Sequence, residues 1–473
     1  MKKRQKFLIL GIAIGLLLAV GFVWAVSTGL VPGPDWLQAK QPDVPQTEQP
    51  GSPQDETDPP QTEPDVPTPP EPEYVDITIA SVGDILIHNT LYFAAYDAAT
   101  QSYDFRPQFK YVKPLLQDAD LTIANLETTL GGQEIGYSSY PKFNTPDSIV
   151  DALKDAGVDI LTAANNHRMD TGLTGFFRTL DVVRAKGLDI IGVRANEAEK
   201  TYALKDVKGI KVAVLNFSYA YPLADGGLSI NGLPLPAEKS NLMDTFDPQD
   251  INQATDVLAR RIAEARSDGA EIVIVCLHWG DEYHRLPNNF QKQLAANLVE
   301  LGVDAILGGH PHVLQPAVYL TSSDGRQVPV FYSQGNFISD QRKETVDNIY
   351  TEQGVIAKVT FRVEKNNLTN NKPTVLVAEA IPTWVNKKII ANRFHYEVIP
   401  VKQTLAAQSK PDFSEEYPLL NAADLERIRF CLETVQSLTQ DLELSSPSLI
   451  ITEGIGAETA AKTNNSEPVF FTP

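Results

Sequence analysis

The sequence predicts an α/β fold in which a largely parallel sheet is covered by helices and packs on a second, more antiparallel sheet. Short apolar runs alternate with segments whose apolar residues recur every three to four positions, which is typical of βαβ units. A glycine stands just past each such segment, where a helix commonly ends in a left-handed residue. After Gly325, strand-like runs follow one another without intervening helices, and this change indicates the second sheet.

The first thirty of the 473 residues have the pattern of a membrane anchor. A basic flank within residues 1–6 precedes residues 7–26, which carry no charge and are long enough for one helix across a bilayer. Because basic flanks stay in the cytoplasm, we expect residues 1–30 to form a single-pass anchor in the cell membrane, with the rest of the chain extracellular. Small residues near Ala25 leave cleavage as a signal peptide open, but the length of the run favours an uncleaved anchor.

Residues 31–73 are rich in Pro, Gln, Thr, Asp and Glu. This composition cannot bury enough apolar surface to fold, and its prolines favour an extended chain. We therefore expect a disordered acidic linker that holds the following domain away from the membrane.

The folded part is expected over residues 74–400. Helical periodicity covers residues 145–156, 172–186, 248–267 and 288–301, and the glycines that follow are Gly157, Gly187, Gly269 and Gly302. The strands expected after Gly325 cover residues 329–333, 354–363 and 374–383. Residues 401–473 are expected to add one amphipathic helix over 422–438 and a flexible polar tail.

Composition excludes some classes of function. The net charge of −20 argues against a nucleic-acid partner, which needs clustered Lys and Arg, and favours solubility outside the cell. Cys276 and Cys431 are the only cysteines, so the chain encodes no disulfide framework and no cysteine-based zinc site. A buried thiol is expected at Cys276, and a single bridge to Cys431 stays open.

Two histidines leave one predicted strand end together. The segment Gly308-Gly309-His310-Pro311-His312 follows the apolar run 303–307, and ligands bind at the carboxyl ends of parallel strands. With Pro311 between them, the two imidazoles can point to the same side of an extended segment, as a metal site requires. The alternative is a loop with two solvated histidines.

Other metal-type side chains follow other predicted strands. Asp84 is a hard ligand at the end of the first strand, and Glu127 offers a second carboxylate that could bridge two ions. In Asn165-Asn166-His167, an amide oxygen can hold a metal while the imidazole donates a proton, as in phosphoesterases. The alternatives are ordinary turn and surface residues.

Two further strand ends complete the set. His278 supplies another imidazole, and Asn336 in a Gly-Asn-Phe turn could orient ligands from behind. A single histidine at a strand end is more often structural, but the recurrence of metal-type residues along one rim favours a metal site.

The motifs resemble a known family. They are Ser81-Val-Gly-Asp84, Asn125-Leu-Glu127, Asn165-Asn-His167, His278-Trp-Gly-Asp-Glu282-Tyr283, Gly309-His-Pro-His312 and Ser333-Gln-Gly-Asn-Phe337. Their order is similar to that of the CapA/PgsA proteins of poly-γ-glutamate capsule biosynthesis, in the calcineurin-like metallophosphoesterase superfamily. The resemblance covers residues 74–400.

The resemblance implies a four-layer sandwich of two mixed β-sheets flanked by helices, with two divalent metal ions (Mn, Fe or Zn) at the strand ends. Carried over, one metal would be held by Asp84 and His312 and the other by Asn166, His278 and His310. The bridge would be Glu127 and the general acid His167. It also implies other capsule synthesis subunits as partners.

The sequence departs from the superfamily pattern in two places. Leu86 stands where the superfamily has a histidine, and His88 either replaces that histidine or simply faces solvent. Glu127 stands where an aspartate bridges the metals. His88, Asn125 and Asn336 are possible metal ligands or residues that hold the ligands in place through hydrogen bonds.

Four more residues are candidates for substrate binding. Arg168 could pair with an anionic group as a planar fork. Glu282, Tyr283 and Arg285 follow the His278 strand and could form one wall of a cleft. His395 lies beyond the motifs and is interpreted as structural.

Three functions agree with these residues. The first is a metal-dependent hydrolase or transferase acting on a phosphoester or on the γ-glutamyl amide of an anionic polymer. The second is a non-catalytic subunit of a capsule synthesis and export complex with a structural or vestigial metal site. The third, a sensor or wall-binding module, rests only on the acidic linker.

Overall fold

The computed structural model describes residues 73–365 and 372–445, all within one compact unit. The expected anchor over residues 7–26 and most of the linker lie outside the described residues. Within the described residues, no helix is both long and apolar enough to cross a bilayer.

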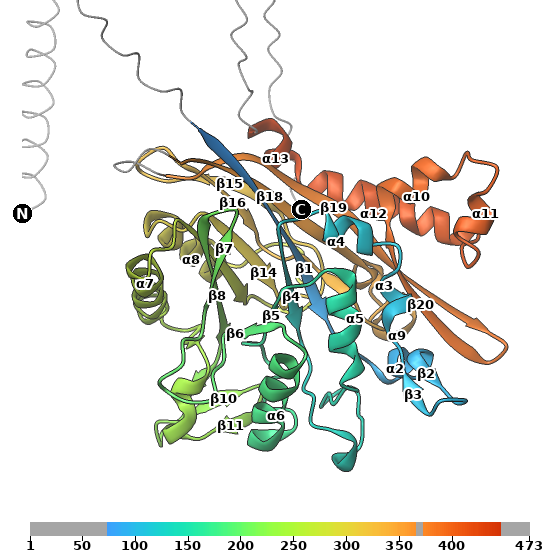
Figure 1. Cartoon of the computed structure of the whole chain (residues 1–473), viewed down its shortest axis with the longest axis horizontal. Helices are drawn as coiled ribbons and strands as arrows, with labels where there is room; N and C mark the ends of the chain where they lie inside the picture. Colours follow the sequence, from blue (N-terminus) through green and yellow to red (C-terminus); the bar gives the residue numbers. More distant parts are fainter. Residues whose placement is uncertain (1–72, 366–371, 446–473) are drawn as a thin grey trace, which may run out of the picture. The chain divides into compact units, whose positions relative to one another are not determined.

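Two mixed sheets form the centre of the described unit (Figure 1). The larger has the order β20 (Arg393–Pro400), β19 (Thr374–Ile390), β18 (Gln353–Glu364), β1 (Tyr74–Ile85), β4 (Leu121–Leu126), β5 (Ile160–Thr162) and β6 (Asp189–Ile191), with β17 (Asn336–Ile338) beside β1. The other has the order β12 (Thr245–Phe246), β8 (Ile210–Tyr219), β13 (Ile272–His278), β14 (Ala305–Gly309), β16 (Gln327–Phe331) and β15 (Ala317–Thr321), with β7 (Ala203–Val207) beside β8. The described residues thus form an α/β fold with two main sheets.

The sheets divide the strands differently from the prediction. The βαβ strands are shared between the two sheets, because β1, β4, β5 and β6 are parallel in one and β8, β13, β14 and β16 are parallel in the other. The late antiparallel strands β18, β19 and β20 do not form a separate sheet but extend the first from β1. Periodicity identifies strands but not their neighbours, which is why the assignment of sheets was wrong.

Helices cover the outer faces of both sheets. The face of the first sheet is covered by α2 (Asn89–Ala95), α3 (Arg106–Phe109), α4 (Lys113–Gln117), α5 (Ser148–Ala156) and α6 (Gly172–Ala185). The other sheet is covered by α7 (Ile251–Ser267) and α8 (Asn289–Glu300), seen at the left of Figure 1. Between the sheets, Ile77 and Ile79 of β1 pack in one cluster with Val214, Ile274 and Leu307. Both sheets are therefore buried on both faces, as continuous apolar strands require.

The predicted helices are confirmed to within a few residues. The glycines at their ends have φ of 107° at Gly157, 77° at Gly187, 96° at Gly269 and 86° at Gly302. Such angles are left-handed and cost a glycine little.

The segment after residue 400 contains more structure than expected. The predicted helix is α12 (Ala422–Leu438), and α10 (Val401–Ala407), α11 (Phe413–Glu416) and α13 (Gln440–Ser445) accompany it. Ile428 and Cys431 pack with Val355 and Trp384 of the first sheet. Residues 401–445 therefore belong to the same compact unit. Both Cys276 and Cys431 are buried free thiols, so the alternative of a bridge is excluded.

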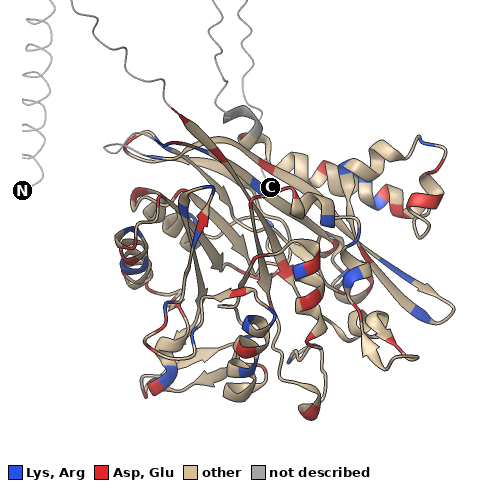
Figure 2. Ribbon diagram, viewed as in Figure 1, with Lys and Arg blue, Asp and Glu red and all other residues tan. Residues whose placement is uncertain are grey.

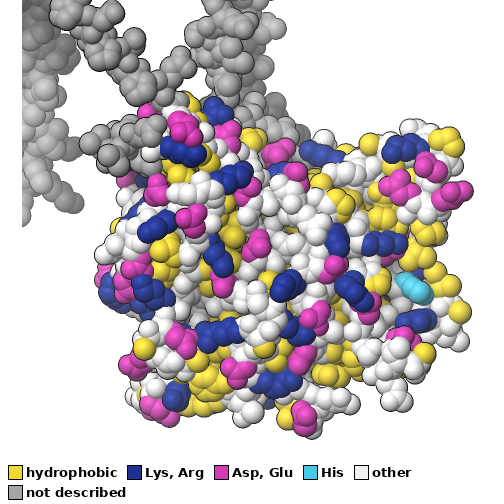
Figure 3. Space-filling model, in the orientation of Figure 1, with side chains coloured by type: hydrophobic (Ala, Val, Ile, Leu, Met, Phe, Trp, Pro, Cys, Tyr) yellow, Lys and Arg dark blue, Asp and Glu magenta, His cyan; other side chains and the backbone are white. Residues whose placement is uncertain are grey.

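Smaller elements complete the described unit. They are β2 (Tyr96–Asp97), β3 (Ser102–Tyr103), β9 (Tyr221–Pro222), β10 (Leu228–Ile230), β11 (Leu233–Leu235) and α9 (Lys343–Val346), with short 3-10 helices at Gln133–Ile135, Ala237–Leu242 and Ile349–Glu352. Lys and Arg lie among Asp and Glu along the ribbon (Figure 2), and the face drawn in Figure 3 shows the same mixture.

Candidate metal centre

Strand ends from both sheets carry the candidate ligands. In the first sheet, Asp84 on β1 is in register with Asn125 on β4 and with Asn336 on β17. In the second sheet, His278 on β13 is in register with Gly309, the residue before His310. The sequence motifs thus come together because parallel strands end at a common rim.

A first group of ligand atoms comes from Asp84, Glu127 and His312, all within 4.8 Å of one another. His312 Nδ1 lies 3.1 Å from Asp84 Oδ2 and 3.1 Å from Asn336 Oδ1. These contacts occupy Nδ1 and leave Nε2, which lies 3.7 Å from Glu127 Oε1, as the nitrogen that can hold a metal.

A second group consists of Glu127, His278 and His310, again within 4.8 Å. His278 Nε2 lies 2.8 Å from Asn166 Oδ1 and 3.4 Å from Glu127 Oε1, so the Asn166 amide joins this group. The two imidazole centroids of His278 and His310 are 4.8 Å apart. Glu127 belongs to both groups and lies where a bridging carboxylate would.

Orphaned polar atoms show that the pocket fits a cation. Glu127 is fully buried, and neither of its carboxylate oxygens has a hydrogen-bond partner among the described residues. Nδ1 of the buried His310 has none either. Such a buried carboxyl group is costly to ionise, and coordination of a metal is one way to compensate the charge of its ionised form. A set of imidazole, amide and carboxylate donors suits manganese, iron or zinc.

Burial sets the protonation of these groups. It raises the pKa of Glu127 well above its ordinary value, and the Asp84 carboxylate adds to the effect. Burial also lowers the pKa of His278 to about 3 and that of His310 well below its usual value. Both imidazoles are therefore neutral, which is the form that binds metals.

The backbone between the two histidines is not extended as the sequence predicted. His310 has φ of 93° and His312 has φ of 56°, both left-handed and unfavourable for residues with a side chain. Their ring centroids are 6.1 Å apart, and Tyr283 N donates to Pro311 O at 2.8 Å. The imidazoles thus converge through a strained turn that the surrounding structure holds.

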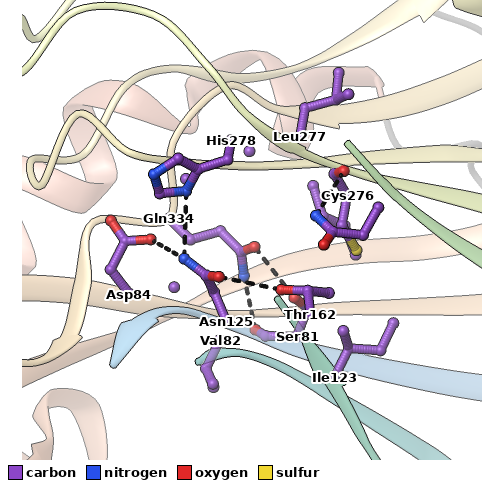
Figure 4. Close-up of a pocket in the computed structure, with 15 residues that line it drawn as sticks. Ser81, Val82, Asp84, Ile123, Asn125, Thr162, Cys276, Leu277, His278 and Gln334 are labelled. Atoms are coloured by element: carbon purple, nitrogen blue, oxygen red, sulfur yellow. Dashed lines mark hydrogen bonds between the residues drawn. The ribbon is translucent and has the colours of Figure 1, made fainter. Parts of the chain in front are cut away.

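Asn125 joins the two sheets behind the ligands (Figure 4). Its Nδ2 donates to Asp84 Oδ1 at 2.8 Å and lies 3.4 Å from His278 Nδ1. Its Oδ1 accepts from Asn165 Nδ2 at 3.2 Å. The cavity around these residues has a volume of about 20 Å³, room for a single water molecule. Asn125 and Asn336 are therefore placed to orient ligands.

His167 is held beside the two groups. Its Nδ1 lies 2.8 Å from Asp170 Oδ2, which also accepts from Phe143 N at 2.6 Å. The Phe143 ring packs edge-on against the imidazole with a centroid distance of 4.8 Å. With Nδ1 engaged by Asp170, Nε2 is the ring nitrogen left for another contact.

Comparison with known proteins gives the family. The model of the family described as "Bacterial capsule synthesis protein PGA_cap" matches residues 78–341. The PGA biosynthesis protein CapA of Bacillus subtilis is 30% identical over 68% of this chain and 77% of that protein. The chain belongs to the PGA_cap family. The range of this chain that matches the PGA_cap model includes all candidate ligands from Asp84 to His312.

Other relatives carry similar names. The capsule biosynthesis protein CapA of Bacillus anthracis is 28% identical over 75% of this chain and 80% of that protein. A probable polyglutamine synthesis accessory protein of Mycobacterium tuberculosis is 26% identical over 47% of this chain and 56% of that protein.

His88 of this PGA_cap chain is not in either ligand group. Its Nδ1 accepts from Asp340 N at 3.3 Å, and its ring packs on Phe143 at 5.2 Å. Because Phe143 also packs on His167, His88 supports the wall behind the imidazole.

Arg168, which was expected to pair with an anionic group of the substrate, is buried inside the fold. Its guanidinium is buried, donates to Phe176 O and lies 4.4 Å from the Phe176 ring centroid. Burial lowers the pKa of Arg168 to about 9. Nη2 and the face of the guanidinium thus contact α6, whereas Nε and Nη1 have no hydrogen-bond partner among the described residues.

The expected cleft wall is present in part. The Tyr283 ring centroid is 6.3 Å from His312, and its hydroxyl accepts from Gln341 Nε2 at 3.2 Å. Arg285 instead stacks on Tyr350 at 3.9 Å. Glu282 is exposed and lines a groove that includes His310.

Sequence reasoning missed two positioning residues. Asp170 follows His167 at a three-residue spacing that could have indicated a contact. Asn216 is a polar residue within the apolar strand β8, and its Oδ1 accepts from Ala164 N at 2.7 Å across the sheets. The polar side chain of Asn216 within an otherwise apolar strand is the sequence feature that could have indicated its role.

Asn216→Ala is expected to destabilise the protein by about 1–3 kcal/mol, because Ala164 N would lose its acceptor in a buried site. Denaturant unfolding measures this change. Asn297→Ala, on the half-buried surface of α8, is the control and should cost less. An unchanged midpoint for Asn216→Ala would contradict the role of this bond in joining the sheets.

Gly309→Ala is expected to weaken metal binding by roughly 10–100-fold, the range seen when ligand supports are changed. A Cβ at this position would lie 2.6 Å from Asp84 Oδ1, so the carboxylate would have to move. Isothermal titration with Mn²⁺ measures the affinity. In Gly302→Ala the added Cβ meets open space at a left-handed helix end, so stability should fall while metal affinity stays.

Proposed function

We propose that this chain is a membrane-anchored extracellular protein of capsule polymer synthesis with a dinuclear metal centre that catalyses hydrolysis or group transfer. The observation that carries the proposal is Glu127, a buried carboxyl group without a hydrogen-bond partner among the described residues, between two groups of ligands. The substrate we propose is a phosphoester or a γ-glutamyl amide in an anionic polymer. The names of the Bacillus relatives support the process.

The roles of the residues follow from their contacts. Asp84 and His312 would hold one divalent cation, Asn166, His278 and His310 the other, and Glu127 would bridge them. When bound, two such ions supply Lewis-acid polarisation of a phosphoryl or acyl group. His167, oriented through Nδ1 by Asp170, donates a proton to the leaving group from Nε2.

The membrane part of the proposal rests on the sequence. Residues 7–26 lack charges and follow a basic flank, so they would place the folded unit outside the cell. The acidic linker over residues 31–73 would separate that unit from the bilayer.

A second candidate is a non-catalytic subunit of a capsule synthesis and export complex, with a structural metal site. The name of the Mycobacterium tuberculosis relative, a synthesis accessory protein, favours it. In this case other capsule synthesis subunits would be the partners of the chain.

Elemental analysis of the purified protein, with parallel assays on phosphodiesters and poly-γ-glutamate, tests the proposal. We expect bound Mn, Fe or Zn and metal-dependent turnover of one substrate class. Asp84→Ala and His310→Ala should lose both metal and capsule polymer output. Loss of metal with retained polymer output would favour the non-catalytic subunit.

A further inference from the structure

A groove opens beside the candidate metal centre, between the end of β8, the turn that joins β10 and β11, and the loop after β13. Its volume is about 590 Å³, within the range of small-molecule sites. His310 lines it, so the groove is continuous with the second ligand group. His310 is only 5% exposed and its Nδ1 has no hydrogen-bond partner among the described residues, so an unpaired imidazole nitrogen is present in a residue that lines this groove.

Aromatic rings form much of the wall. The Tyr219 ring centroid lies 4.9 Å from that of His310, and Tyr221, 44% exposed, lies 6.1 Å from Tyr219. Phe246 and Phe290 stack at 5.5 Å elsewhere in the lining. Such walls bind apolar groups and also organic cations, because ring faces attract positive charge.

The charged side chains of the lining are carboxylates. Asp281 Oδ2 accepts from Asn288 Nδ2 at 2.9 Å, whereas the Glu282 carboxylate forms no hydrogen bond or ion pair with a described residue. No Lys or Arg belongs to the described lining. A concave wall of one sign concentrates ligands of the opposite sign, so the part of the groove at Asp281 and Glu282 favours a cation over a carboxylate.

We propose that the groove is a subsite for a primary ammonium group carried by the substrate or by the acceptor that reacts at the metal centre. Glu282 binds the ammonium, and Tyr219 and Tyr221 pack against the adjoining carbon atoms. The proposal rests on the proposed function for what happens at the metal centre, and it adds the chemical class recognised next to it. The anionic reactant would lie at the metal cations, and the amine would lie in the groove.

The test is a calorimetric titration of the full-length, metal-loaded protein with benzylammonium. Benzyl alcohol, a neutral compound of the same shape, is titrated in parallel. We expect benzylammonium to bind about tenfold tighter, as one charge-assisted hydrogen bond and ring contacts allow. Glu282→Gln should remove that preference and leave benzyl alcohol unchanged. Tyr221→Ala should weaken the binding of both compounds.

The matched control is Glu426→Gln, an exposed glutamate on α12, which should bind both compounds like the unmodified protein. Equal affinity for the two compounds in the unmodified protein, or unchanged benzylammonium binding in Glu282→Gln, would overturn the subsite. Metal content and phosphodiester turnover are measured on the same samples. If the protein binds metal and turns over the phosphodiester but does not bind the amine, only the subsite is overturned. If the protein holds no metal, the proposed function is overturned.

Discussion

Glu127→Gln is expected to remove most of the bound metal and to make thermal stability independent of chelator. The substitution takes away the one carboxylate that belongs to both ligand groups, so both sites lose a charged ligand. A metal present at 100 times its Kd adds about 2.7 kcal/mol to the folded state. EDTA should therefore lower the Tm of the unmodified protein by a few degrees and leave that of Glu127→Gln unchanged.

The same substitution should have the opposite effect once metal is removed. In the metal-free protein Glu127 has no hydrogen-bond partner among the described residues, and its raised pKa means that the folded protein must pay for protonating it, a cost that an amide avoids. Glu127→Gln should then have the higher Tm of the two metal-free proteins. Elemental analysis and thermal denaturation with and without EDTA measure both effects, and Glu426→Gln is the control. Full metal content in Glu127→Gln would contradict the bridging position.

His167→Asn is expected to lower kcat by about 10²–10⁴-fold, the usual contribution of a general acid, while metal content stays the same. Asn keeps the size of the polar group but cannot transfer a proton. The imidazole is not in either ligand group within the described residues, so the metal should be retained. Steady-state kinetics on the substrate found in the assays, with elemental analysis, tests this.

Asp170→Asn separates positioning from proton transfer. It weakens the contact to His167 Nδ1, which is 2.8 Å long, and so should lower kcat less than His167→Asn with little change in KM. His395→Asn, on β20, is the control and should keep full activity. If His167→Asn retains both turnover and capsule output, the general-acid role is wrong and the non-catalytic subunit is favoured.

Local patterns predicted much of this molecule. The helices over residues 145–156, 172–186 and 288–301 have the predicted type and end at glycines with left-handed φ. These features depend on residues near one another in the chain, through periodicity and helix capping. The recurrence of Asp84, Glu127 and His278 at strand ends depends on the same local information.

Contacts between distant segments were not predictable in this way. Strand β18 pairs with β1, so that β18, β19 and β20 extend the first sheet, and the sequence does not state this pairing because backbone hydrogen bonding is the same for any partner strand. The burial of Arg168 against Phe176 depends on the position of α6, which no motif states. The contact of Asn216 with Ala164 exists only because the two sheets pack together.

The amino-acid sequence alone shows which side chains are available for a metal centre and that they follow predicted strands. The folded structure is needed to show that Glu127 lies between two ligand groups without a hydrogen-bond partner among the described residues, and that His310 and His312 converge through left-handed backbone. The physical reason is that side-chain chemistry and strand ends are local properties. Distances between ligands, burial and backbone strain arise from packing between residues that are far apart in the chain.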